Sequence, residues 1–157
     1  MYISTSDELR AFCERIGKEH VIAVDTEFLR ERTYYPKLCL VQVGTASEIG
    51  AIDPILIDDL SPLADIFADE RVTKVFHACE QDLEVILDGM GVVCASVFDT
   101  QVTAAFLGMR QQVSYASLVE AYSGVRLPKA ESLTDWSRRP LDPEQLTYAE
   151  DDVRYLP

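Results

Sequence analysis

The sequence predicts a mixed α/β protein in which helices flank a single sheet. Three strand-like segments follow one another closely early in the chain, at residues 21–28, 38–44 and 48–53. Connections this short favour an antiparallel meander. Beyond residue 60, helical and strand-like segments alternate, which is typical of a sheet covered by helices. A chain of 157 residues fits one domain with a substantial core.

The N-terminal segments carry local signals for their structure. Thr5 and Glu8 have the spacing of a capping box, which predicts a helix that ends at about residue 17. Apolar and β-branched residues then predict strands, and the third of these ends at Asp53-Pro54. The expected segments are a strand, a turn and two further strands, at residues 21–28, 33–37, 38–44 and 48–53.

The rest of the chain predicts helices separated by short strands. Pro62 falls in the first turn of a helix from Ser61 to about Asp69. Gly89 and Gly91 close the helix that follows. The expected order after residue 70 is a strand at 73–78, a helix at 80–89, a strand at 96–98, and helices at 100–109, 115–123 and 143–155.

The composition argues against a protein that binds nucleic acid by charge alone. The net charge is −13, whereas such binders are normally basic. A nuclease that reaches phosphate through metal ions stays possible. Two groups of basic residues are candidates for phosphate contacts, although a solvated surface is the simpler interpretation of each: Arg30, Arg32 and Lys37, and then Arg126, Lys129, Arg138 and Arg139. Neither a membrane span nor a signal peptide is indicated, so we expect a cytoplasmic protein.

Two carboxylates in the first predicted strand point to a bound cation. Side chains alternate faces along a strand, so Asp25 and Glu27 project from the same side. Two like charges about 4 Å apart near a protein surface repel by roughly 4 kcal/mol. The segment at 21–28 contains no Lys or Arg that could offset this repulsion. A metal ion is therefore the simplest explanation for the pair.

Further acidic residues lie on predicted helices. Asp82 falls in the first turn of a helix, where the helix dipole favours a negative charge. Tyr148 and Asp152 are four residues apart and share one helix face. Asp99 ends a strand and is expected chiefly to cap the next helix, with support of the metal site as a lesser role. Taken singly, Asp82 could be an ordinary helix-start acid, and Asp152 part of an exposed acidic patch.

In their order along the chain these motifs resemble bacterial ribonuclease D, in the tyrosine-bearing branch of the DEDD exonuclease superfamily. No single motif is specific, but the ordered set is, and it covers nearly the whole chain. The matching segments are Asp25–Phe28, Arg32–Pro36, Gln42, His77–Leu83, Phe98–Gln101, Tyr122–Val125, Leu133–Trp136, Arg139–Leu141 and Tyr148–Leu156.

The resemblance implies a ribonuclease H-like fold, with a mixed five-stranded sheet, and a 3′-to-5′ exoribonuclease activity. In that family two magnesium or manganese ions cleave the terminal phosphodiester bond and 5′-mononucleotides are released. The implied metal ligands are Asp25, Glu27, Asp82 and Asp152. Tyr148 would orient the attacking water. Thr26, Phe28 and His77 would meet the terminal nucleotide, and a purely structural histidine is an equal alternative for His77.

Other properties carried by the resemblance concern the substrate and the extent of the chain. RNA 3′ ends are the expected partner, with tRNA precursors as the family's substrate, and we expect a monomer. The family's C-terminal helical RNA-binding domains are absent, so residues 1–157 are expected to be a catalytic domain from a truncated chain. Glu150 departs from the family pattern and is expected to face solvent rather than the metals. A proofreading-type DNA exonuclease and a non-catalytic nucleic-acid-binding module remain alternatives.

Overall fold

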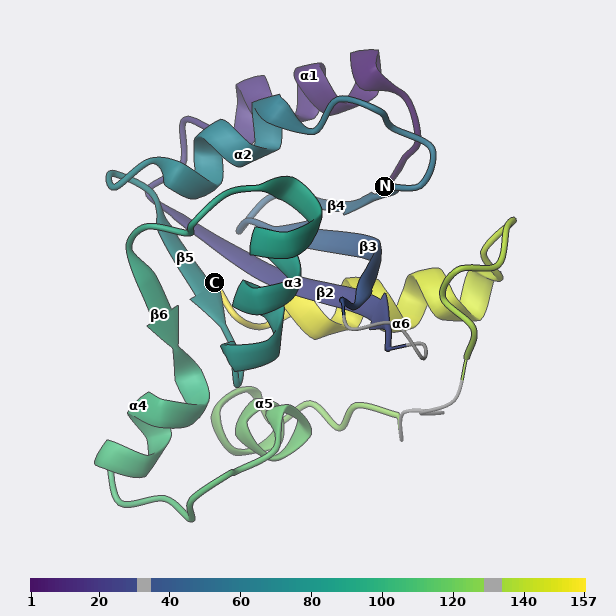
Figure 1. Ribbon diagram of the computed structural model, residues 1–157. Coiled ribbons are helices and arrows are strands. Elements are labelled where there is room, and N and C mark those ends of the chain that lie inside the picture. The colour runs from purple at the N-terminus through teal and green to yellow at the C-terminus, as the bar shows by residue number, and fades with distance from the viewer. Residues whose placement is uncertain (31–34, 129–133) are drawn as a thin grey trace.

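A computed structural model describes residues 1–30, 35–128 and 134–157. Within these residues six strands form one sheet in the order β1-β4-β3-β2-β5-β6 (Figure 1). The strands are β1 (Tyr2–Ile3), β2 (Val21–Leu29), β3 (Lys37–Gly44), β4 (Ile49–Ile52), β5 (Thr73–Phe76) and β6 (Val97–Asp99).

The sheet confirms the predicted fold class. Strands β2, β3 and β4 form the antiparallel meander, while β5 pairs with β2, and β6 with β5, in parallel. The expected count of five strands is wrong by one, because β1 pairs in parallel with β4 at the edge of the sheet. A strand of two residues is too short to show a pattern of alternating side chains, so no sequence pattern predicts it.

The described residues also form six helices: α1 (Ser6–Ile16), α2 (Ser61–Ala68), α3 (Glu80–Met90), α4 (Thr100–Phe106), α5 (Tyr115–Ser123) and α6 (Pro143–Arg154). The capping box at Thr5 and Glu8 is present. Helix α4 ends three residues earlier than predicted. Gly108 adopts a φ of 87°, and the Met109 N–H returns to the Ala104 carbonyl, which together terminate the helix.

The described core has three clusters: a small one joins Ala104 of α4 to Leu118 of α5, and the other two lie on the two faces of the sheet. The larger joins α1, α2 and α3 to one face and includes Ile22 and Val24 of β2. The smaller includes Ala149 of α6 and packs against Cys39 and Leu40 of β3. Figure 1 shows α1 and α2 together on one side and α6 running across the other. Strand β2 therefore has a different helical partner on each face, and its alternate side chains meet different helices.

Some predictions fall on parts of the chain that the structure leaves undescribed. These are the first two residues of the turn at 33–37, and the residues Arg32, Lys129 and Leu133. In the part of the chain that is described, no helix combines the length and the apolar character needed to cross a membrane.

Candidate active site

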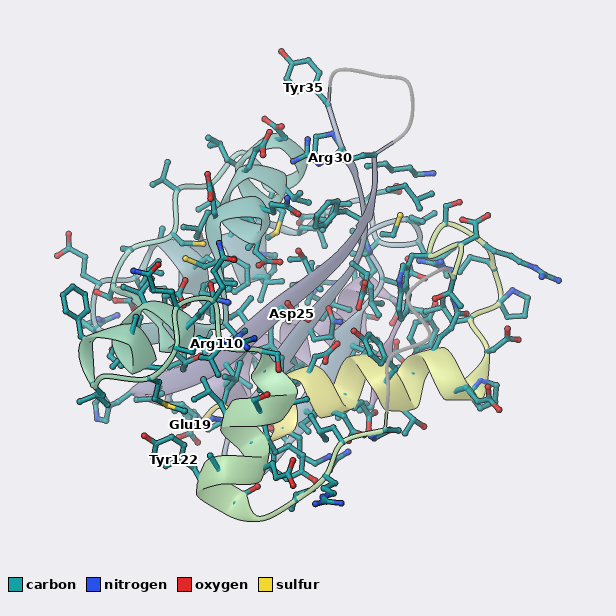
Figure 2. All side chains as sticks on the ribbon, turned by 90° about the horizontal axis from the view of Figure 1, so that it is seen from below. Glu19, Asp25, Arg30, Tyr35, Arg110 and Tyr122 are labelled. Atoms are coloured by element: carbon teal, nitrogen blue, oxygen red, sulfur yellow. The ribbon has the colours of Figure 1, made fainter. Side chains whose placement is uncertain are left out.

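Strand β2 brings Asp25 and Glu27 together with α6. Because Val24 packs with the α1–α3 cluster, its neighbour Asp25 faces the other side of the sheet, where α6 lies. One carboxylate oxygen each from Asp25, Glu27 and Asp152 lie within 4.8 Å of one another. Figure 2 shows Asp25 on the sheet near the centre of the molecule. The structure thus joins three of the four predicted metal ligands in one cluster.

Asp82 approaches the same strand from α3. Pairing between β2 and β5 covers only Val21–Ala23, and the backbone turns at Ala78, with a φ of 59°, before α3 begins. The Thr26 hydroxyl donates a hydrogen bond of 2.5 Å to Oδ1 of the buried Asp82. The charge of Asp82 also raises the pKa of Asp25. The fourth predicted ligand therefore lies beside the cluster and acts on it electrostatically.

Asp99 confirms its predicted role as a helix cap and has a second set of contacts. Its carboxylate accepts hydrogen bonds from the backbone N–H groups of Gln101 (2.8 Å) and Val102 (3.2 Å) at the start of α4. It also accepts from the N–H groups of Ala78 (3.1 Å) and Cys79 (2.9 Å), which lead into α3. One carboxylate thus fixes the turn that sets the start of the helix carrying Asp82.

The clustered carboxylates hold their protons more tightly than isolated ones. Burial, reinforced by the charge of Asp152, raises the pKa of Glu27 to about 8. Burial also raises the pKa of Asp152 to about 7 and that of Asp82 to about 6. The pKa of Asp25 rises well above its ordinary value, first through burial and then through the charge of Asp82. Converging oxygen ligands of this kind fit hard divalent cations such as magnesium or manganese.

Gln42 is a buried neighbour of the cluster to which the sequence analysis gave no role. It lies opposite Asp25 in the β2–β3 register, and its Nε2 donates a 3.4 Å hydrogen bond to Oε1 of Glu27. Its own Oε1 is buried and has no hydrogen-bond partner among the described residues. A polar residue in an otherwise apolar strand was the available signal, since Gln42 sits in the run Leu38–Gly44.

Tyr148 lies beside Asp152 on α6, as their spacing predicted. Burial and the neighbouring charges of Asp152 and Glu27 raise the pKa of Tyr148, so its phenol stays protonated at neutral pH. A hydrogen bond with Tyr148 in turn lowers the pKa of Asp152 against the effect of burial. The phenol is therefore a hydrogen-bond donor in this site, and it is unsuited to act as a general base.

Tyr115 is a second tyrosine near the carboxylates and was not anticipated. Its hydroxyl donates a 2.9 Å hydrogen bond to the carbonyl of Asp151, next to Asp152 on α6. Its ring lies 5.8 Å from that of His77. The charges of Asp152 and Asp25 help to raise the pKa of Tyr115 after burial. Tyr115 therefore connects α5 to the turn of α6 that presents Asp152.

The predicted nucleotide-binding residues differ in how much of each side chain is free. The Thr26 hydroxyl is committed to Asp82. Both His77 ring nitrogens are paired, Nδ1 with the Thr100 hydroxyl and Nε2 with the Val113 carbonyl, each at 2.9 Å. Burial lowers the pKa of His77, which favours the neutral ring. Phe28 is partly buried, and the Arg30 guanidinium lies 5.9 Å from its ring centre.

The basic residues that the structure describes do not form one phosphate-binding group. Arg30 pairs with Glu84 at 2.9 Å and, with Tyr35, lies at the end of the β2–β3 hairpin, away from Asp25 (Figure 2). Arg126 pairs with Glu120 at 2.7 Å on the surface. Arg139 is instead largely buried against Asp53. The interpretation of Arg139 as a solvated surface residue is therefore wrong.

Glu150 lies outside the carboxylate cluster. Its side chain pairs with the amino group of Met1 at 2.9 Å and with Arg154 at 3.3 Å. Part of its surface stays exposed, as the sequence predicted, but two positive partners hold it at the surface of α6. These two ion pairs explain the position of the Glu150 carboxylate without a bound metal ion.

Comparisons with known proteins agree with this geometry. The model of the 3′-5′ exonuclease family matches residues 1–157. A ribonuclease D from Sphingobium indicum is 52% identical over 156 residues, which cover 98% of this chain and 40% of that relative. The crystal structure of Escherichia coli RNase D, an exoribonuclease involved in structured RNA processing, aligns with a TM-score of 0.95 and 47% identity over 99% of this chain and 42% of its own.

A more distant structure contains a metal ion. Brucella melitensis NrnC with bound Mg²⁺ aligns with a TM-score of 0.77 and 25% identity over 88% of this chain and 69% of its own. This chain spans about two fifths of the length of the ribonuclease D relatives. The resemblance to ribonuclease D is thus confirmed, and the chain belongs to the 3′-5′ exonuclease family.

Proposed function

We propose that this chain is the catalytic part of an exoribonuclease that hydrolyses phosphodiester bonds at RNA 3′ ends and releases 5′-mononucleotides. The observation that carries the proposal is the convergence of Asp25, Glu27 and Asp152 within 4.8 Å, with the protonated phenol of Tyr148 beside Asp152. The match to the 3′-5′ exonuclease family supports the direction of cleavage.

Asp25, Glu27, Asp82 and Asp152 would hold two divalent cations, Mg²⁺ or Mn²⁺. The four side chains offer only carboxylate oxygens, which suit these ions. Burial raises the pKa of all four, and neighbouring negative charges raise it further, so a bound cation would relieve both effects. When bound, two such ions lower the pKa of water and stabilise negative charge on the leaving 3′-oxygen.

Tyr148 would orient the attacking water through its hydroxyl. The phenol is protonated and borders the carboxylates, so it can donate to or accept from a water near Asp152 without taking its proton. The phenol and the Asp152 carboxylate lie close enough for each to shift the pKa of the other. The role proposed for Tyr148 is thus to position the water that acts as the nucleophile.

The terminal nucleotide would lie along the end of β2. Phe28 offers a partly exposed ring for stacking on the terminal base, a contact that reads no sequence. Thr26 would contribute its backbone, since its hydroxyl is used by Asp82. His77 would contribute only its ring, because both nitrogens are already hydrogen-bonded.

RNA is the substrate that the relatives favour. The carboxylate chemistry serves RNA and DNA alike, but the 47% identity to Escherichia coli RNase D, an exoribonuclease involved in structured RNA processing, supports RNA. Within that class we propose tRNA precursors as the substrate, acted on by a monomer in the cytoplasm.

Matched single-stranded RNA and DNA, each labelled at the 5′ end, provide the test. With Mg²⁺, the RNA is expected to shorten stepwise from its 3′ end while the DNA is degraded more slowly. Faster loss of the DNA would favour a proofreading-type exonuclease. Binding of both strands with no shortening would favour a non-catalytic module.

A further inference from the structure

We propose that Trp136 is a positioning residue for Tyr148, and that Arg139 holds Trp136 in place. The inference rests on the water-orienting role proposed for Tyr148. It adds two residues from the segment before α6, neither of which is a predicted metal ligand or nucleotide-binding residue.

The contact between the two rings is direct. The ring centroids of Trp136 and Tyr148 lie 6.1 Å apart with an interplanar angle of 38°. Trp136 is 8% exposed and belongs to the small core cluster between α6 and the sheet, against which Tyr148 packs. Separations of this size are typical of attractive aromatic pairs. The indole of Trp136 therefore packs against the phenol ring of Tyr148 and limits where that ring can lie.

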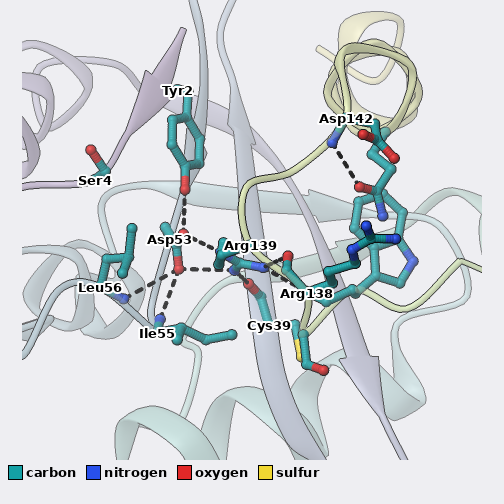
Figure 3. A network of polar contacts seen from close by, with 12 residues as sticks. Tyr2, Ser4, Cys39, Asp53, Ile55, Leu56, Arg138, Arg139 and Asp142 are labelled. Carbon is teal, nitrogen blue, oxygen red and sulfur yellow. Dashed lines mark hydrogen bonds and ion pairs between the residues drawn. The ribbon is translucent and has the colours of Figure 1, made fainter.

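Arg139 holds the backbone of the segment that contains Trp136 (Figure 3). Its Nη1 donates to the carbonyls of Trp136 (2.7 Å) and Arg138 (2.9 Å), and its Nη2 donates to the Cys39 carbonyl of β3 (2.8 Å). Nε and Nη2 also donate to the two carboxylate oxygens of Asp53, at 2.6 and 2.9 Å. The guanidinium thus uses all five of its N–H groups within the protein.

Asp53 connects this arrangement to the body of the fold. It is fully buried just after β4 and accepts hydrogen bonds from the Tyr2 hydroxyl and from the backbone N–H groups of Ile55 (2.9 Å) and Leu56 (3.3 Å). Arg139 therefore attaches the segment before α6 to two strands of the sheet. The position of the Trp136 backbone is set by the sheet as well as by α6.

This support matters because the Tyr148 phenol is proposed to orient the attacking water, which requires a fixed position. Tyr148 must keep its hydroxyl at Asp152, while its ring can still rotate about two side-chain torsions. A displacement of about 1 Å at a reacting group can cost roughly 100-fold in rate. Loss of the Trp136 indole leaves the charged groups and the metal ligands of the site intact but lets the Tyr148 ring move.

The test compares single and double variants. Trp136→Leu is expected to lower kcat by roughly 10- to 100-fold, with KM for RNA and the Kd for Mn²⁺ changed little. Trp136→Phe should keep much of the rate, because an aromatic ring again packs against Tyr148. In a Tyr148→Phe background, Trp136→Leu should cause almost no further loss, since the hydroxyl that it positions is gone. Phe67→Leu, in the largest core cluster, is the control for a general loss of packing.

Trp136 is the only tryptophan in the chain, so its emission reports on the site without labelling. Arg139→Lys keeps the charge but removes the donors to the Trp136 and Cys39 carbonyls. We expect a red-shifted emission together with a lower kcat. Arg15→Lys alters the exposed Arg15–Glu48 pair and should change neither.

Three results would overturn the inference. In the first, Trp136→Leu lowers kcat by the same factor with and without the Tyr148 hydroxyl. In the second, its loss of kcat follows the fraction of folded protein, as for Phe67→Leu. Both leave the proposed function intact if Tyr148→Phe is itself slow. In the third, Tyr148→Phe turns over at the unmodified rate, which contradicts the role proposed for Tyr148 as well.

Discussion

The Thr26 hydroxyl donates a 2.5 Å hydrogen bond to Asp82, although Thr26 lies on the opposite face of β2 from Asp25 and Glu27. Thr26 faces α3, from which Asp82 projects, and the two acids on either side of it face α6. The hydrogen bond therefore fixes the one predicted ligand that reaches the cluster from the other layer.

Loss of this hydrogen bond should weaken metal binding. Thr26→Val keeps the shape of the side chain but removes the hydroxyl that donates to Asp82, and a hydrogen bond to a charged group contributes about 1.5–3 kcal/mol. We expect a higher Kd for Mn²⁺, measured by calorimetry, and a lower kcat. Thr26→Ser retains the hydroxyl and should behave like the unmodified chain. Equal Mn²⁺ affinity for the Val and Ser variants would show that the contact does not position Asp82.

Asp25→Asn should abolish cleavage and stabilise the metal-free fold. Asp25 is the member of the cluster whose pKa rises through the charges of all three other acids in addition to burial. Removing its charge relieves that repulsion, and for a chain of this size 1 kcal/mol corresponds to about 2–4 °C in Tm. Thermal unfolding with a chelator present measures the effect. A lower Tm for the variant would contradict the repulsion.

The stability of the metal-free protein should fall as pH rises. The pKa of Glu27 is raised from 4.5 to about 8, so the folded state binds this proton more tightly than the unfolded state. The stabilisation is fully present below the unfolded pKa and is lost as pH rises through the folded pKa. Between pH 4.5 and 8, Tm should decline more steeply in the unmodified chain than in Glu27→Gln. Parallel declines would reject the shift, and added Mg²⁺ should restore Tm at the alkaline end.

Asp53→Asn should destabilise the fold strongly. The variant leaves the Arg139 guanidinium, only 16% exposed, without its carboxylate partner. Breaking a buried ion pair in this way costs about 3–5 kcal/mol in the free energy of unfolding. Urea denaturation gives the value, and Asp69→Asn, in the exposed pair with Arg71, should cost much less. Similar losses in the free energy of unfolding for the two variants would show that burial of the Arg139–Asp53 pair does not increase its contribution to stability.

The sequence predicted residues whose roles depend on local spacing. The Asp99 cap follows from a polar residue at a strand–helix boundary, and Tyr148 and Asp152 share a helix face because they are four residues apart. The pair Asp25 and Glu27 follows from strand alternation. In each case the interacting groups are close in the chain, so their relative positions are set by the secondary structure alone.

Other relationships depend on how distant segments meet. Asp53 was expected only to end a strand and Arg139 to lie at the surface, yet they form a buried pair across 86 positions. Likewise, spacing placed Asp82 at a helix start but could not show that Thr26 would hold it beside β2. Such contacts follow from sheet order and from where each strand ends, which local patterns do not contain.

Product release from a 3′-labelled single-stranded RNA tests the central claim most directly. With Mg²⁺ the chain should release labelled 5′-mononucleotide from the first turnover onward, and excess chelator or Asp152→Ala should stop the release. Undiminished release in the presence of chelator, or a labelled fragment longer than one nucleotide as the first product, would contradict a metal-dependent exonuclease acting from the 3′ end.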